Sequence, residues 1–131
     1  MATIEKFEDI EAWKAARELA NNIFKLTLRD TFRLDYSLVN QIKSSSGSVM
    51  DNIAEGFERD GRTEFIQFLS VAKGSVGESR SQLYRAFDRN YISEEEFNIY
   101  SNQATKISKM LSGLITYLRT SENKGIKYKT D

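Results

Sequence analysis

Apolar side chains recur along this chain at the i, i+3, i+4, i+7 spacing of amphipathic helices, in four segments separated by polar or glycine-containing stretches. The expected helices cover about residues 9–29, 37–58, 63–89 and 93–118. Helices of roughly 20 residues are about 30 Å long, and short connections between them favour an antiparallel arrangement. The pattern therefore predicts an all-α fold, an antiparallel up-down-up-down four-helix bundle over residues 1–118. A polar C-terminal tail is expected over residues 119–131.

Three helix starts carry capping signals. Asp9 and Thr63 stand where the first and third helices are expected to begin, and both residue types accept hydrogen bonds from free backbone N–H groups. Ser93 is followed three residues later by Glu96, which is the spacing of a capping box. No segment shows the alternation of a β-strand, so we expect helices alone.

The composition narrows the function classes. The chain has 131 residues, 19 lysine plus arginine, 19 aspartate plus glutamate, and a formal net charge of zero, which argues against strong non-specific binding to nucleic acid. It has no cysteine and no histidine, so disulfides, thiolate sites and histidine bases are excluded. No apolar run has the length of a membrane span, and the N-terminus lacks the apolar core of a signal peptide. We expect a cytoplasmic protein without membrane contact.

Polar side chains interrupt the apolar faces of the two central helices. Asn52 and Glu55 lie on or beside the inward stripe of the second helix, and Ser75, Glu78 and Gln82 follow one edge of the third. The favoured interpretation is a polar seam, with Asn52 and Glu55 largely buried and hydrogen-bonded, that fixes how the helices pack. The alternative is a functional carboxylate pair made by Glu55 and Glu78.

An enzymatic or metal-dependent role finds little support in these residues. Glutamate-lined di-iron bundles also need Glu-x-x-His pairs, and this chain has no histidine. No stretch has the spacing of a calcium loop, and a hydrolase with paired carboxylates needs a cleft that a packed bundle seldom offers. We therefore expect no enzymatic activity and no cofactor.

Small residues are concentrated in the same two helices. They are Ser44, Ser45, Gly47 and Ser48 in the second helix, and Gly74, Ser75 and Gly77 in the third. Glycine inside a helix costs about 1 kcal/mol relative to alanine, so a close neighbour is expected, either another helix or another subunit. A phosphate-binding turn is the rival interpretation, but the chain contains no G-x-x-x-x-G-K-[ST] sequence.

A run of basic residues accompanies the third helix, with Tyr84 and Tyr91 interleaved. Its members are Arg59, Arg62, Lys73, Arg80, Arg85 and Arg89. Nearby carboxylates such as Glu64 and Asp88 dilute the charge, which favours an ordinary solvated face. The alternative is a small RNA-contacting patch in which tyrosine rings stack on bases.

Apolar positions outside the main stripes predict self-association. The first helix carries two adjacent apolar stripes, and Ile66, Tyr84 and Tyr91 lie roughly 90° from the main stripe of the third. A monomer would expose these side chains as a patch, which soluble proteins usually avoid. Because the spare positions lie on different helices, a heterologous, ring-closing contact is expected rather than a two-fold one.

Three motifs follow one another along the chain in the order found in one known protein family. "FEDIEAWKAA" at residues 7–16 is similar to that family's F-x-D-L-x-x-W-x-x-A, and "LVNQIKSSSGSVMDNIAEG" at 38–56 is similar to its L-x-x-Q-I…S-x-x-x-N-I-A-E-G. "EFIQFLSVAKGSVGESRSQL" at 64–83 resembles its E-F-x-x-F-L-x-x-A-x-G-S-x-x-E…Q-L. Through these motifs the chain resembles the proteins encoded in intervening sequences of bacterial 23S ribosomal RNA genes. The chain departs from the family in lacking a proline before the second helix, and "SSSGSV" replaces an arginine-containing run, which weakens an RNA contact through that segment.

The resemblance implies a four-helix bundle, a homopentameric assembly and no established enzymatic activity. A related protein of diversity-generating retroelements partners a reverse transcriptase and RNA, so association with RNA or a ribonucleoprotein is also implied. The resulting hypothesis is a non-enzymatic, oligomeric interaction protein that associates with RNA. The alternative is a pure protein–protein scaffold with no nucleic-acid contact, and salt-dependent RNA binding distinguishes the two.

Overall fold

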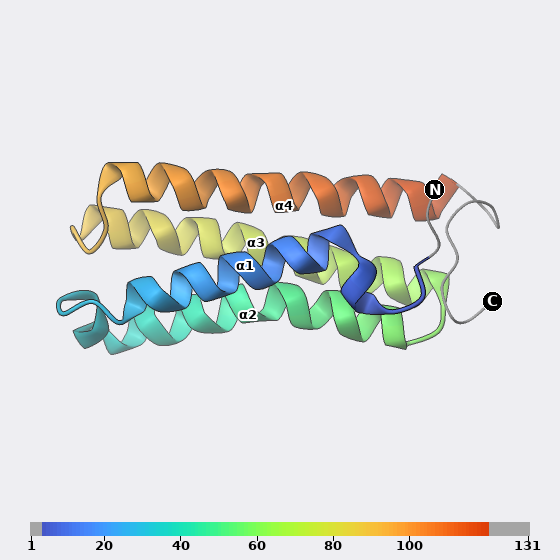
Figure 1. Ribbon diagram of the computed structural model, residues 1–131, viewed down its shortest axis with the longest axis horizontal. Coiled ribbons are helices and arrows are strands. Elements are labelled where there is room, and N and C mark those ends of the chain that lie inside the picture. Colours follow the sequence, from blue (N-terminus) through green and yellow to red (C-terminus); the bar gives the residue numbers. More distant parts are fainter. Residues whose placement is uncertain (1–3, 121–131) are drawn as a thin grey trace.

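The computed structural model describes residues 4–120 and consists of long α-helices lying side by side (Figure 1). The helices are α1 (Glu11–Thr27), α2 (Tyr36–Glu58), α3 (Arg62–Asp88) and α4 (Glu94–Thr120), with short 3₁₀ turns η1 (Phe7–Asp9) and η2 (Phe32–Leu34). No strand occurs within residues 4–120. The predicted all-α fold is confirmed.

The helices pack in the order in which the chain makes them. α1 lies on α2, α2 on α3 and α3 on α4, and a less extensive contact between α1 and α4 closes the bundle. The α1–α2 and α3–α4 connections lie at one end of the molecule and the α2–α3 connection at the other (Figure 1). This is the up-down-up-down arrangement that short connections favour.

The ends of three helices show how local chemistry sets their limits. The predicted capping box is confirmed, because the Ser93 N–H donates to Glu96 Oε1 at 2.9 Å and the Glu96 N–H donates to Ser93 Oγ at 3.1 Å. The α2 and α3 helices each end in a turn with a left-handed residue, Asp60 (φ 64°) and Asn90 (φ 62°). Aspartate and asparagine tolerate this conformation better than most residues.

The predicted N-caps Asp9 and Thr63 are wrong. Asp9 ends the η1 turn, its carboxylate accepts a hydrogen bond from the Glu5 N–H at 3.4 Å, and α1 begins after the buried Ile10. α3 begins one residue before Thr63, because Gly61 takes the extended N-cap conformation. In both cases backbone turns on the N-terminal side of the helix set its start.

The core is built from one buried stripe on each helix. On α1 the buried positions include Ala16, Leu19 and Ile23, whereas Phe24 on the neighbouring stripe is 43% exposed. Phe32 anchors the α1–α2 connection in this core and stacks on Tyr91 with ring centroids 5.0 Å apart. Only part of the wide apolar face of α1 is therefore covered within the chain.

The helical region extends slightly beyond its predicted end. α4 continues to Thr120, two residues into the expected tail, and residues 121–131 of that tail lie outside the described residues. None of the helices within residues 4–120 combines the length and apolar character needed to cross a membrane.

Candidate functional site

A cluster of buried polar side chains lies between α2 and α3. Ser45 Oγ on α2 lies 2.8 Å from Ser79 Oγ and donates to Gln82 Oε1 at 2.6 Å, and both partners are on α3. All three residues are at most 5% exposed. Buried hydroxyls and amides without partners would be destabilising, so this cluster pairs α2 and α3 in one register.

A second group of polar side chains continues this interface. Ser75 Oγ donates to Ser48 Oγ at 3.0 Å and joins the two helices. Asn52 is half-buried, and its Nδ2 donates to the Ser48 carbonyl and to Ser48 Oγ, each at 2.8 Å. The two groups together, which we call the polar seam, consist of Ser45, Ser48, Asn52, Ser75, Ser79 and Gln82.

The two glutamates assigned to the seam by the sequence lie outside it. Glu55 is exposed and pairs with Arg59 one turn later on the same side, with Oε2 and Nη2 2.9 Å apart. Glu78 is also exposed. The prediction that Glu55 is buried is wrong, because a small rotation from the core line places it where water and Arg59 solvate its charge.

The sequence prediction of the seam did not include Ser79, although Ser79 lies four residues after Ser75 and three before Gln82, the spacing of one helix face.

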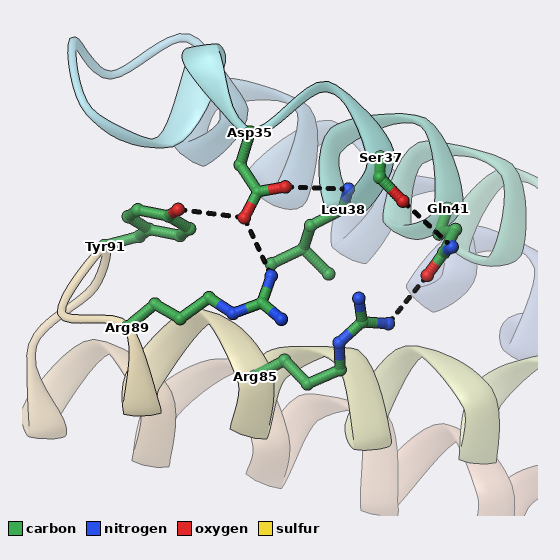
Figure 2. Close-up of polar contacts among 7 residues, drawn as sticks. All are labelled: Asp35, Ser37, Leu38, Gln41, Arg85, Arg89 and Tyr91. Carbon is green, nitrogen blue, oxygen red and sulfur yellow. Dashed lines mark hydrogen bonds and ion pairs between the residues drawn. The ribbon is translucent and has the colours of Figure 1, made fainter.

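The basic run does not form one continuous face. Arg85 Nη1 donates to Gln41 Oε1 at 2.6 Å, and Arg89 Nη1 donates to Asp35 Oδ2 at 2.8 Å, so both lie toward α2 (Figure 2). The Arg59 pair with Glu55 engages a third member. These three arginines therefore donate hydrogen bonds to side chains of the same chain.

The other three basic residues follow a different line on α3. At about 100° per residue, Arg62, Lys73 and Arg80 fall within about 20° of one another. Lys73 is exposed, whereas Arg62 and Arg80 are half-buried. Tyr84 lies beside this line, is 50% exposed and packs on Phe97 of α4 with ring centroids 4.6 Å apart.

A hydrogen-bonded cluster ties together the two connections at one end of the bundle (Figure 2). Asp35 caps α2 by accepting from the Leu38 N–H at 3.2 Å, and its Oδ2 also accepts from the Tyr91 hydroxyl at 2.8 Å. The Tyr91 hydrogen bond, with Arg89 adding a further contribution, lowers the pKa of Asp35. The same bond raises the pKa of Tyr91. The cluster holds the start of α2 against the α3–α4 connection.

A second ion pair strengthens the same end. Both terminal guanidinium nitrogens of Arg29, Nη1 and Nη2, donate to the carboxylate of Glu96, which also caps α4. Chiefly because of the Arg29 hydrogen bonds, the pKa of Glu96 is lowered to about 2. The glutamate therefore stays charged through the physiological range.

Several large apolar side chains remain exposed on the outer faces. They are Phe24, Leu28, Leu34, Tyr36, Val71, Tyr84 and Ile99. Tyr84 behaves as predicted, whereas Ile66 and Tyr91 are half-buried and pack against the core. A β-carbon added to Gly74 or Gly77 would meet no atom within 4 Å, so these glycines are not required by packing inside the chain.

No group of three or more histidine, cysteine, aspartate or glutamate side chains that could hold a metal occurs among the described residues.

Fold and site together define a single antiparallel four-helix bundle with a hydroxyl- and amide-containing seam. The family model described as 23S rRNA-intervening sequence protein matches residues 8–113, so the chain belongs to this family. It is also similar to a solved structure described as a protein of unknown function from the S23 ribosomal protein family of Bacteroides thetaiotaomicron. The two share 25% identity and a TM-score of 0.73, over 79% of this chain and 97% of the other. No curated protein matches the chain.

Proposed function

We propose that this protein is a non-enzymatic bundle that assembles with copies of itself and associates with RNA or a ribonucleoprotein. The proposed assembly rests on the exposed apolar side chains and glycines of the outer face of α3. Val71 and Tyr84 are 52% and 50% exposed there, and Gly74 and Gly77 lie between them with open space above their backbone. Helical glycines that cost about 1 kcal/mol each are explained if a neighbouring subunit approaches closely.

A ring suits the distribution of the exposed apolar side chains. Val71 lies on α3 and Ile99 on α4, so unlike surfaces are available for contact between subunits. Unlike surfaces joined head to tail generate cyclic assemblies when the rotation closes. The family resemblance points to a homopentamer.

The proposed lack of enzymatic activity rests on how the polar groups are used. The seam residues are serine, asparagine and glutamine, which satisfy one another across the interface. The groups with shifted pKa values, such as Asp35 and Glu96, belong to ion pairs that hold helix ends. Such ion pairs also shift pKa values in purely structural settings.

The association with RNA is supported by the family's link to 23S ribosomal RNA and by basic side chains outside ion pairs, such as Lys73. The rival function is a protein–protein adaptor without nucleic-acid contact. It is favoured by the intrachain partners of Arg59, Arg85 and Arg89, which reduce the positive charge offered to a phosphate backbone.

Light scattering of the full chain tests the assembly. We expect a mass several times the 15.1 kDa of one subunit, near five times for a pentamer. Val71→Glu places a charge on the α3 face and is expected to reduce the mass, whereas Asn102→Glu, at an exposed position of α4, serves as the matched control. A wild-type mass of one subunit would refute self-association, and an unchanged mass for Val71→Glu would refute this face as the contact.

Fluorescence anisotropy with a labelled hairpin RNA tests the second part. Binding that weakens steeply between 50 and 200 mM salt is expected if phosphates are contacted, because each contact releases counterions. Absence of binding at 50 mM salt would favour the adaptor function.

A further inference from the structure

An open groove runs beside α1 on the side that faces α2. It has a volume of about 790 Å³, and its lining residues belong neither to the polar seam nor to the ion pairs at the bundle end. Its lining includes Arg17, Ala20, Asn21 and Phe24 from α1, and Met50 from α2. The groove thus joins an apolar floor to charged and amide side chains.

Phe24 is the unusual residue of this groove. Its side chain is 43% exposed although it lies within a helix, and Lys43 of α2 places Nζ 5.5 Å from the centroid of the ring. Ala20 and Met50 beside it are half-buried. The Lys43 Nζ lies over the ring, and because the lysine side chain is flexible and exposed, a nucleobase can take its place on the ring while the displaced ammonium neutralises a phosphate.

The charges around the groove favour an anionic ligand. Arg17 and Lys43 are exposed, and no carboxylate among the described residues forms an ion pair with either. Lys14 also lines the groove but pairs with Glu11 at 3.1 Å, and Glu18 supplies an opposing negative charge. Arg17 and Lys43 are therefore the two cations available to phosphates.

The cations and rings extend along one line of α1. The Arg17 guanidinium carbon lies over the Trp13 ring, 5.8 Å from its centroid, and Trp13, Arg17 and Phe24 recur at helical spacing on one side. The line from Trp13 to Phe24 spans 11 residues, or about 16 Å of helix. Such a surface suits an extended chain more than a compact ligand.

We propose that this groove binds a short stretch of single-stranded RNA, with a base stacked on Phe24 and phosphates held by Arg17 and Lys43. Asn21 lies in the groove wall, where its amide can donate to and accept from the edge of the base. The inference rests on the proposed association with RNA, and it names the surface and the form of RNA.

The test uses the full chain and a fluorescein-labelled adenylate decamer, with anisotropy measured at 50 and 200 mM potassium chloride. Phe24→Leu keeps an apolar side chain but removes the stacking face, and we expect it to weaken binding by roughly fivefold or more. Arg17→Gln combined with Lys43→Gln is expected to weaken binding and to lower the salt slope by about 0.7 for each lost phosphate contact. Lys109→Gln, at an exposed position of α4, makes the same charge change away from the groove and should bind as wild type does.

Tryptophan emission gives a second readout of RNA binding by the folded protein. Trp13 is the single tryptophan of the sequence and lies beside Arg17, so bound RNA is expected to quench it. Circular dichroism checks that each variant retains its helices. If Phe24→Leu loses its helical signal, the Arg17 and Lys43 substitutions decide the outcome.

The outcomes separate this proposal from the broader one. If every variant binds the decamer as strongly as wild type does, the groove is not the binding surface, although the association with RNA stands. The same conclusion follows if the protein binds the hairpin RNA but not the decamer. Binding of neither RNA would overturn both proposals. A fall in assembly mass in the groove variants, with RNA binding unchanged, would assign the groove to protein contact and overturn the proposal as well.

Discussion

Gly56 is the position at which α3 leaves no room for a side chain on α2. A β-carbon added there would lie 2.5 Å from Phe68 Cβ and 3.3 Å from Phe65 Cδ1. The Phe68 Cβ is joined directly to the backbone, so it cannot swing aside as the end of a long side chain can. Gly56→Ala therefore has two opposing effects on stability: the higher helix propensity of alanine stabilises α2, and the steric clash with Phe68 destabilises the α2–α3 interface.

The two magnitudes decide the sign of the effect. Replacing glycine by alanine inside a helix stabilises it by about 1 kcal/mol, whereas overpacking a well-filled interface costs about 1–3 kcal/mol and occasionally more. Because the Phe68 Cβ lies only 2.5 Å from the added carbon, we expect the clash to cost about 2–3 kcal/mol, the upper part of this range, and the net loss in the free energy of unfolding to be about 1–2 kcal/mol. For a chain of this length that corresponds to a fall of roughly 3–8 °C in Tm.

Gly113→Ala is the matched control, because an added β-carbon there would meet no atom within 4 Å. It should raise stability by up to about 1 kcal/mol. Urea and thermal unfolding followed by circular dichroism at one protein concentration measure both variants, since self-association would make Tm depend on concentration. A Gly56→Ala protein as stable as Gly113→Ala would refute the steric argument.

Three further outcomes are expected. Gln82→Ala should lower the free energy of unfolding by about 1–3 kcal/mol, because it opens a cavity and removes a partner of Ser45; an unchanged urea midpoint would contradict this. Glu55→Ala should leave the urea midpoint close to that of wild type, because its ion pair is exposed. Because Arg29 lowers the folded-state pKa of Glu96 from 4.5 to about 2, its stabilising effect should be complete above about pH 5 and disappear as the pH falls toward 2. In Glu96→Gln the free energy of unfolding should depend less on pH between about 5 and 2 than in wild type. If the two proteins show the same pH dependence in this range, the ion pair contributes nothing to stability.

The helical segments were predictable because apolar periodicity records which face each helix buries. The Ser93–Glu96 box was predictable for a similar reason, since its partners are only three residues apart. The polar seam was recognised as a feature of α2 and α3, but its membership was only partly correct. Gln82 and Ser75 are buried in it, whereas Glu55 is not.

What the sequence by itself determined was the local pattern: four amphipathic helices, their short connections, a capping box and the absence of histidine and cysteine chemistry. Tertiary structure alone decided which side chains near a stripe boundary face the core and which face water. A helical wheel places Glu55 within about 40° of the core line, and the packing of α3 determines on which side of the boundary it falls. The pairing of Asp35 with Tyr91 and the opening beside Phe24 likewise depend on how helices far apart in sequence approach one another, and a one-dimensional pattern contains no such distance.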